Sequence, residues 1–349
     1  MGIRYATRED VKDALDSAET ARNNTKIDAA LDTATDTITG LCHRTFYPEL
    51  KTVAFDWPDP QSPTSWRLWL EQHELIEPIT VTAGGVTLAV DGLKLYPQSG
   101  PPYDRIETDL SGAAVFGSGS TTQQTIEIYG LFGHRNDEAT AAALTAAVPN
   151  ATATAVDVTD GSQVGVGSVL RIGTERLVVT GRRQLDTGQT ITDDLAAQNN
   201  LTGLKVGDGD AFAIGEVVLV DTERMLIVDI AADTLIVKRA WDGTVLAGHT
   251  TGATVYSPRR LLVDRGVLGT TAAAHGNADT VTAWQPPGAV RELAVAEALT
   301  TLGQKASGYA RTIGTGESER EALGKGIDSL RRQVYRAFGR KGRIRVVAR

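Results

Sequence analysis

The chain is poor in cysteine and has no long apolar run. Its single cysteine, Cys42, excludes an intrachain disulfide and argues against a metal site built on thiolates. No segment approaches the roughly 20 apolar residues of a membrane-spanning helix. The first residues also lack the apolar stretch of a secretion signal. We therefore expect a soluble protein made in a reducing cytoplasm, with Cys42 as a buried thiol and with no membrane contact.

Acidic residues are missing from the last part of the chain, although the net charge is −8. Residues 331–349 hold eight basic residues and no acid, which leaves 27 basic against 43 acidic residues elsewhere. A basic tail on an acidic body indicates a binding partner. The candidate partner-binding residues of this segment are Arg331, Arg332, Arg336, Arg340, Lys341, Arg343, Ile344, Arg345, Val346, Val347 and Arg349. Within it, 344–347 is apolar and could add to a partner as an edge strand.

Apolar spacing predicts helices at both ends of the chain and strands between them. Apolar residues recur at three- and four-residue intervals near 7–18, 25–42, 289–305 and 317–338, as on one face of a helix. Alternating apolar residues and glycine-rich turns between residues 53 and 132 indicate strands. Residues 135–157 are rich in alanine and threonine and predict a linker.

An internal repeat fills residues 158–282, with its halves in an unusual order. Residues 158–179 resemble 206–227, sharing the Thr-Glu-Arg triplets 174–176 and 222–224. Residues 235–256 resemble 261–282. Two tandem copies would alternate their halves, whereas one copy inserted into its twin gives the order seen. We therefore expect an outer module (158–203 and 258–284) and an inner module (204–257) nested in it, each a small all-β barrel or sandwich.

The repeated polar residues could suggest catalysis, because Glu175 and Glu223 recur with His275 and His249. No nucleophile accompanies them in both copies, so we interpret the triplets as turn and register devices. These residues are Thr174, Glu175, Arg176, Thr222, Glu223 and Arg224. Gly165-x-Gly167 lacks the third glycine of a dinucleotide fingerprint. Asp208-x-Asp210 lacks the remaining ligands of a calcium loop. We expect no enzyme, no cofactor and no metal.

Four short motifs outside the repeats point to a family. They are YATREDV at 5–11, ITGLCHRTFYP at 38–48, GLFG at 130–133 and PPGAVR at 286–291. In this order they resemble the head-to-tail connector (adaptor) proteins of long-tailed bacteriophages. The repeat motif with Gly-Thr-Thr-Ala-Ala-Ala-His also resembles β-modules of phage virion proteins.

The resemblance implies a discontinuous helical core, 1–134 and 285–349, interrupted by the linker and the nested modules. The expected fold class is thus α+β, a helical bundle with a small β-region. It further implies a structural virion protein at the head–tail interface, forming a ring of typically twelve subunits that extends the DNA channel beneath the portal. Its partners would be the portal protein and a head–tail stopper or another tail-side protein. DNA would pass through without sequence-specific binding, which suits an acidic wall.

Two other functions stay open. The basic helix and tail could bind nucleic acid, with an affinity that falls steeply with salt. The modules could instead bind carbohydrate or a host surface, which would require exposed aromatic clusters within them.

Overall fold

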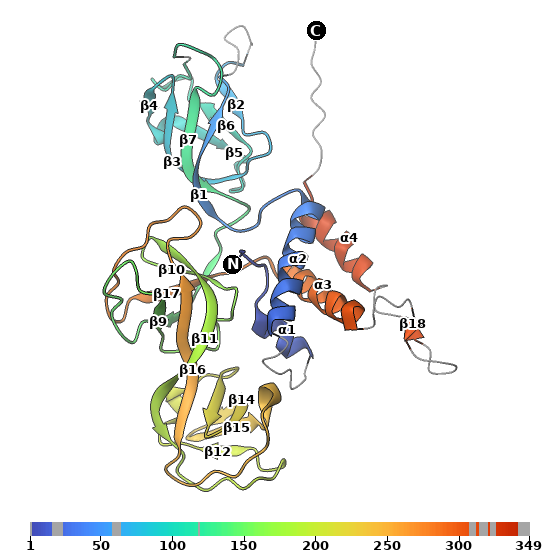
Figure 1. Ribbon diagram of the computed structural model, residues 1–349. Coiled ribbons are helices and arrows are strands. Elements are labelled where there is room, and N and C mark those ends of the chain that lie inside the picture. Colours follow the sequence, from blue (N-terminus) through green and yellow to red (C-terminus); the bar gives the residue numbers. More distant parts are fainter. Residues whose placement is uncertain are drawn as a thin grey trace. The chain divides into compact units, whose positions relative to one another are not determined.

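The computed structural model describes residues 2–15, 24–57, 64–117, 119–306, 312–313, 320–321 and 326–340. The chain divides into two compact units (Figure 1). The first comprises Met1–Cys42, Glu138–Val267 and Thr271–Arg349. The second comprises His43–Asp137 with Leu268–Thr270.

The α-helices of the described residues belong to the first unit. They are α1 (Arg8–Leu15), α2 (Asn24–Cys42), α3 (Gly288–Ala306) and α4 (Ile327–Phe338). In α2, Ile27, Leu31 and Ile38 are buried and repeat at helical spacing, so this face packs on its neighbours. Helix α3 contacts α1, α2 and α4, and Figure 1 shows α2, α3 and α4 side by side. None of the helices in the described part of the chain is long and apolar enough to cross a membrane.

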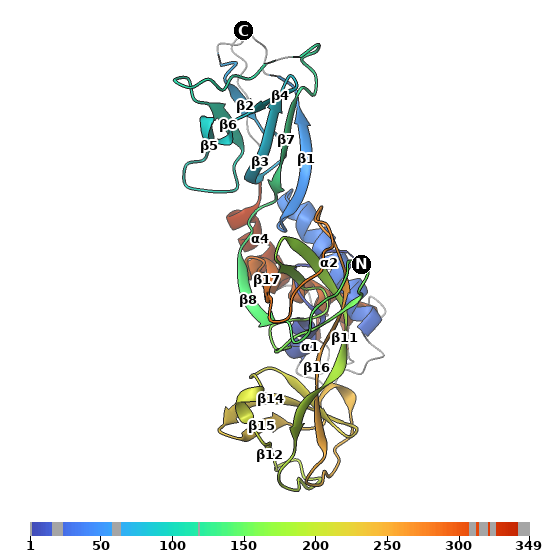
Figure 2. The same ribbon diagram turned by 90° about the vertical axis from the view of Figure 1, so that its left-hand side faces the viewer.

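The first unit also contains two modules, which are joined by one ten-stranded antiparallel sheet. The strands are β8 (Glu138–Ala143), β9 (Ala155–Asp157), β10 (Val169–Ile172), β11 (Glu175–Thr190), β12 (Gly203–Lys205), β13 (Val217–Val220), β14 (Glu223–Ala231), β15 (Thr234–Lys238), β16 (Thr254–Asp264) and β17 (Thr280–Trp284). The long strands β11 and β16 pair along their length, with bulges, and run from one module into the other (Figure 2).

Each module has its own apolar core, and the two cores use matching positions of the repeat. Leu170, Leu177 and Val263 lie in the outer core, whereas Val218, Met225 and Val237 occupy the same places in the inner core. Strand β16 supplies side chains to both cores, and Ile191, the residue that follows β11, lies in the inner core. The inner module is therefore an excursion within a hairpin of the outer one. Two further short strands, β18 (Thr312–Ile313) and β19 (Arg320–Glu321), pair with each other.

The second unit is a β-structure with its own core. It contains β1 (Glu49–Phe55), β2 (Arg67–Trp69), β3 (Leu75–Ala83), β4 (Val86–Leu88), β5 (Leu93–Tyr96), β6 (Arg105–Thr108) and β7 (Ile126–Phe132). One sheet has the order β1-β7-β3-β4 and the other the order β2-β6-β5. Phe55, Leu75, Ile106, Ile128 and Phe132 are among the side chains buried between them.

The expected fold class, a helical bundle with a small β-region, is wrong. Strands occupy more of the described chain than helices do, and they form large antiparallel sheets. The physical reason lies in residues 43–137, which bury enough apolar side chains to make a unit of their own. The resemblance implied only a small β-region here, although the alternation of apolar residues between 53 and 132 indicates several strands.

The segment expected to be a linker also carries strands. Strand β8 pairs with β17, and β9 pairs with β16. Leu144, Val148 and Val156 are buried in the outer core. Two of its alanines, Ala141 and Ala142, are buried in the same core.

Candidate functional site

The repeated glutamates lie at equivalent places in the two modules. Glu175 begins β11 and Glu223 begins β14, each directly after a two-residue turn that contains Thr174 or Thr222. Both carboxylates are completely buried. A buried carboxylate is costly unless it is paired and hydrogen-bonded, so its partners decide what it does.

In the inner module, Glu223 is the centre of a closed ion-pair cluster. Arg239 donates to both of its oxygens, from Nε at 2.8 Å and from Nη2 at 2.7 Å. The backbone N–H groups of Ala240 and Ala247 donate to it as well, at 2.8 and 2.9 Å. His249 Nε2 lies 3.0 Å from Glu223, and its Nδ1 lies 2.8 Å from Asp221. The carboxylate thus has several donors and a bidentate cation.

The outer module repeats this cluster around Glu175. Arg265 donates from Nε and from Nη2, each at 2.6 Å. The amides of Gly266 and Ala273 donate at 3.1 and 3.0 Å, and His275 Nε2 lies 2.7 Å away. One difference separates the copies: Gly173 stands where the inner module has Asp221, so only His249 lies between two carboxylates.

The guanidinium groups also tie distant loops together. Arg239 donates to the carbonyls of Ala196, Leu201 and Ala247. Arg265 similarly donates to the carbonyls of three residues, Asn150, Ala153 and Ala273. Each arginine therefore fastens two loops of its module to the start of the central strand.

These contacts keep both carboxylates ionised. Burial alone would raise the pKa of Glu175, but the hydrogen bonds from Arg265, Ala273 and His275 outweigh it and lower the pKa to about 2. The pKa of Glu223 is likewise lowered to about 2, because the donors from Arg239, Ala247, Ala240 and His249 outweigh its burial. A general acid or base working near neutral pH needs a pKa close to 7. The clusters are therefore suited to holding loops and not to transferring protons.

The arginines adjacent to these glutamates pair elsewhere. Arg176 lies 3.6 Å from Glu138, and Arg224 bonds Asp242 at 2.8 Å. The sequence pattern singled out the triplets but not the true partners, Arg239 and Arg265. The signal was present, because both arginines are identical positions of the second half-repeat, ten residues before the repeated histidines.

The basic C-terminal candidates fall into four groups. Arg331 donates to Glu297 of α3 at 2.6 and 2.9 Å, so it holds α4 on α3. Arg332 and Arg336 lie one turn apart on the exposed face of α4, opposite the buried Ile327 and Val334. The backbone N–H of Arg340 donates to the carbonyl of Cys42. The remaining candidates lie outside the described residues: Lys341, Arg343, Ile344, Arg345, Val346, Val347 and Arg349.

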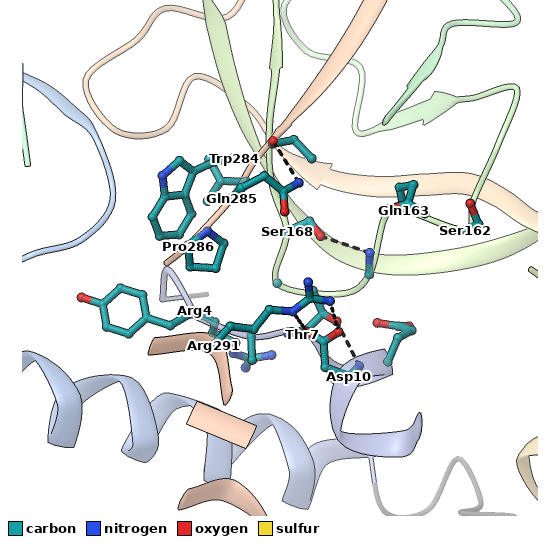
Figure 3. A pocket seen from close by; sticks show the side chains of 17 residues that line it. Arg4, Thr7, Asp10, Ser162, Gln163, Ser168, Trp284, Gln285, Pro286 and Arg291 are labelled. Carbon is teal, nitrogen blue, oxygen red and sulfur yellow. Dashed lines mark hydrogen bonds and ion pairs between the residues drawn. The ribbon is translucent and has the colours of Figure 1, made fainter. Parts of the chain in front are cut away.

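A small polar pocket lies where α1, α3 and the outer module meet (Figure 3). Its volume is about 100 Å³. Arg291 of α3 forms an ion pair with Asp10 of α1, and Ser168 of the outer module accepts from the Gly165 amide on the facing wall. Arg4, also in its lining, pairs with Asp28 and Asp32. The charged groups of the pocket thus stabilise the packing of α1, α3 and the outer module against one another.

Exposed aromatic clusters, which a carbohydrate-binding module requires, occur in neither module but have a counterpart in the second unit. There Arg105 stacks on Trp69 at 5.0 Å and on Tyr96 at 4.2 Å, and Arg67 stacks on Trp66 at 4.7 Å. The guanidinium groups already cover these ring faces, so the rings do not form an open stacking platform.

The described residues contain no group of three or more His, Cys, Asp or Glu placed to hold a metal ion. The chain matches no protein-family model, no curated protein and no solved structure.

Proposed function

We propose that the chain is a structural protein of a phage virion, a head-to-tail adaptor that forms a ring beneath the portal and joins the capsid to the tail. The observation that carries the proposal is the exposed basic face of α4. Arg332 and Arg336 face solvent on a helix that is anchored from behind, and the chain then continues into the basic segment 341–349. A rigid cationic helix before a basic tail is suited to an acidic protein surface.

The anchoring of α4 supports this role. The Arg331–Glu297 pair and the buried Ile327 and Val334 hold the helix against α2 and α3. Because the helix is fixed, docking orders fewer side chains and loses less conformational entropy. The acidic balance of the other residues supports a DNA conduit, since an anionic wall does not retain a passing polyanion.

The modules fit the same proposal as rigid attachments. The two histidine–glutamate pairs that suggested catalysis are parts of the clusters that hold loops in place, and both copies have such a pair. Nested modules with closed ion-pair clusters would brace or decorate a ring. Their own chemistry is not needed for the joint between head and tail.

The test is binding to the portal protein of the same virus. The purified chain alone and with portal is weighed by mass photometry and imaged by negative-stain microscopy. We expect rings of about twelve subunits, as in the family that the motifs resemble. Arg332→Glu with Arg336→Glu should weaken portal binding at least tenfold, about 1.4 kcal/mol or more.

A matched control reverses the same number of charges elsewhere. Arg183→Glu with Lys205→Glu changes two exposed residues of the modules and should leave portal binding within about twofold. A chain that stays monomeric and does not bind the portal at any concentration tested would contradict the proposal. Equal loss in both double variants would mean that net charge acts, and not the face of α4.

A further inference from the structure

The outer module docks on the chain's own N-terminal segment through one loop, 165–168. The Arg8 amide donates to the Val166 carbonyl at 3.0 Å, and the Val166 amide donates to Glu9 at 2.6 Å. A Cβ on Gly165 would lie 2.6 Å from the Thr7 side chain, so the two surfaces are in close contact. This docking leaves Val166 only 1% exposed.

The neighbouring apolar residues of the outer module are covered too. Val169 and Val178 face each other across β10 and β11, and both are buried. Together with Val166 they form one apolar face. This face of the fold is therefore a docking surface in the outer copy.

The inner module carries the same face without a cover. Ile214 stands at the position of Val166 and is 57% exposed. Val217 and Leu226 pair across β13 and β14 as Val169 and Val178 do, but they are only partly buried. Val228, 48% exposed, adds an apolar side chain where the outer copy has Thr180. Among the described residues, no hydrogen bond engages the Ile214 amide or carbonyl, in contrast to those of Val166.

This face lines a groove of about 500 Å³ between the inner module and α1. Two buried acceptor atoms in its lining, Gln184 Oε1 and Asn24 Oδ1, have no hydrogen-bond partner. A buried acceptor without a donor is costly, so N–H groups from an incoming chain would be favoured here. The groove thus combines an apolar surface with unsatisfied acceptors in its lining, which suits a polypeptide.

The charges around the groove indicate what kind of polypeptide. Basic and acidic side chains are equally numerous in the lining: Arg8, Lys12, Arg182 and Arg224 against Glu9, Asp10, Asp13 and Asp242. A balanced rim does not attract a polyanion such as DNA. It fits a protein surface of mixed charge, as a second copy of the chain would present.

We infer that the groove around Ile214 and Val228 is the contact through which a second copy of the chain binds in the ring. The inference rests on the proposed function, because a ring needs a head-to-tail contact between a surface on one subunit and a different surface on the next. The uncovered copy of a docking face provides one of these surfaces. Each subunit then covers its own outer module and its neighbour's inner module.

The test compares two Glu substitutions within one module. Ile214→Glu with Val228→Glu should weaken self-association at least tenfold, as measured by mass photometry over a dilution series. Val245→Glu is the control, because Val245 is 80% exposed in the same module and does not line the groove. It should leave assembly unchanged. If the Glu pair lowers the melting temperature, Ile214→Ser with Val228→Ser removes the apolar atoms without adding charge.

A crosslinking experiment identifies the neighbour directly. Cys42 is buried, so a photoreactive maleimide can be placed on Ile214→Cys alone. Crosslinks from residue 214 to a second copy in the assembled ring support the inference. Wild-type rings whose assembly is insensitive to the 214 and 228 variants, or crosslinks only within one chain, overturn it and leave the proposed function standing. A wild-type chain that never assembles overturns both.

Discussion

A carboxylate removed from water needs a fixed cation and several N–H donors, and Glu175 and Glu223 each have both. The cost of burying these charges is offset only while the whole cluster is intact. Removing one member leaves the other charge buried without compensation. The cluster is therefore a point of high sensitivity within each module, and its sensitivity can be measured by substituting the arginines.

Arg239→Met and Arg224→Met separate the cluster from the neighbouring surface pair. Loss of Arg239 leaves the Glu223 carboxylate buried without its cation and should reduce the stability of the inner module by about 3–5 kcal/mol. Arg224 is partly exposed with its partner Asp242, and its loss should cost under about 1 kcal/mol. Hydrogen exchange at the Met225 and Ile227 amides measures both. Equal costs would show that the arginine adjacent to Glu223 in sequence matters as much as Arg239.

The sequence marked these residues without revealing their roles. Identical positions in both half-repeats included Glu175, Arg265 and His275, which meet in the outer cluster. What one sequence could not show is which half-repeat faces which, because pairing across 90 residues depends on how β11 and β16 align. The Glu and Arg that are adjacent in each triplet have different partners in the fold.

At the scale of elements, the loop 165–168 joins the outer module to the start of α1. In the sequence, Gly165 belongs to a Gly-x-Gly pair that lacks the third glycine of a dinucleotide motif. Its role is steric, since the Thr7 and Glu9 side chains occupy the space of a Cβ. The inner copy has Ala213 at this place and no helix start against it. A loop contact of this kind depends on tertiary structure, so residue spacing alone could not predict it.

Gly165→Ala should release the N-terminal segment from the outer module. The new methyl group would lie 2.6 Å from Thr7 Cβ, so the segment must shift away. The Arg8 and Val166 amides should then exchange hydrogen at least tenfold faster. Gly40→Ala is the matched control. No atom outside its own helix backbone and its two chain neighbours lies within 4 Å of its Cβ position, and alanine favours a helix by up to about 1 kcal/mol. Unchanged exchange in Gly165→Ala would show that the contact is not tight.

At the scale of the molecule, the stabilities of the two units should respond differently to a fall in pH. In the second unit, burial lowers the pKa of His134 to about 4, with help from the positive charges of Arg44 and Arg135. Nη1 of Arg44 lies 3.0 Å from Nδ1 of His134. Because a guanidinium can only donate, Nδ1 accepts this hydrogen bond, and the imidazole ring is neutral. In the first unit, the two clusters hold carboxylates with a pKa of about 2. The division into units, which the sequence did not reveal, separates these two responses.

The two units should lose stability in different pH ranges. The folded pKa of His134 lies below its unfolded value of roughly 6.5, so its contribution is complete above that pH and is lost as the pH falls toward 4. Glu175 and Glu223 contribute fully above roughly pH 4.3 and lose their contribution as the pH falls toward 2. Hydrogen exchange resolved along the chain, from pH 7 to pH 3, should therefore show protection in 43–137 declining first. His134→Gln should flatten that early decline and leave the modules unaffected, whereas an early decline in the modules as well would contradict this account.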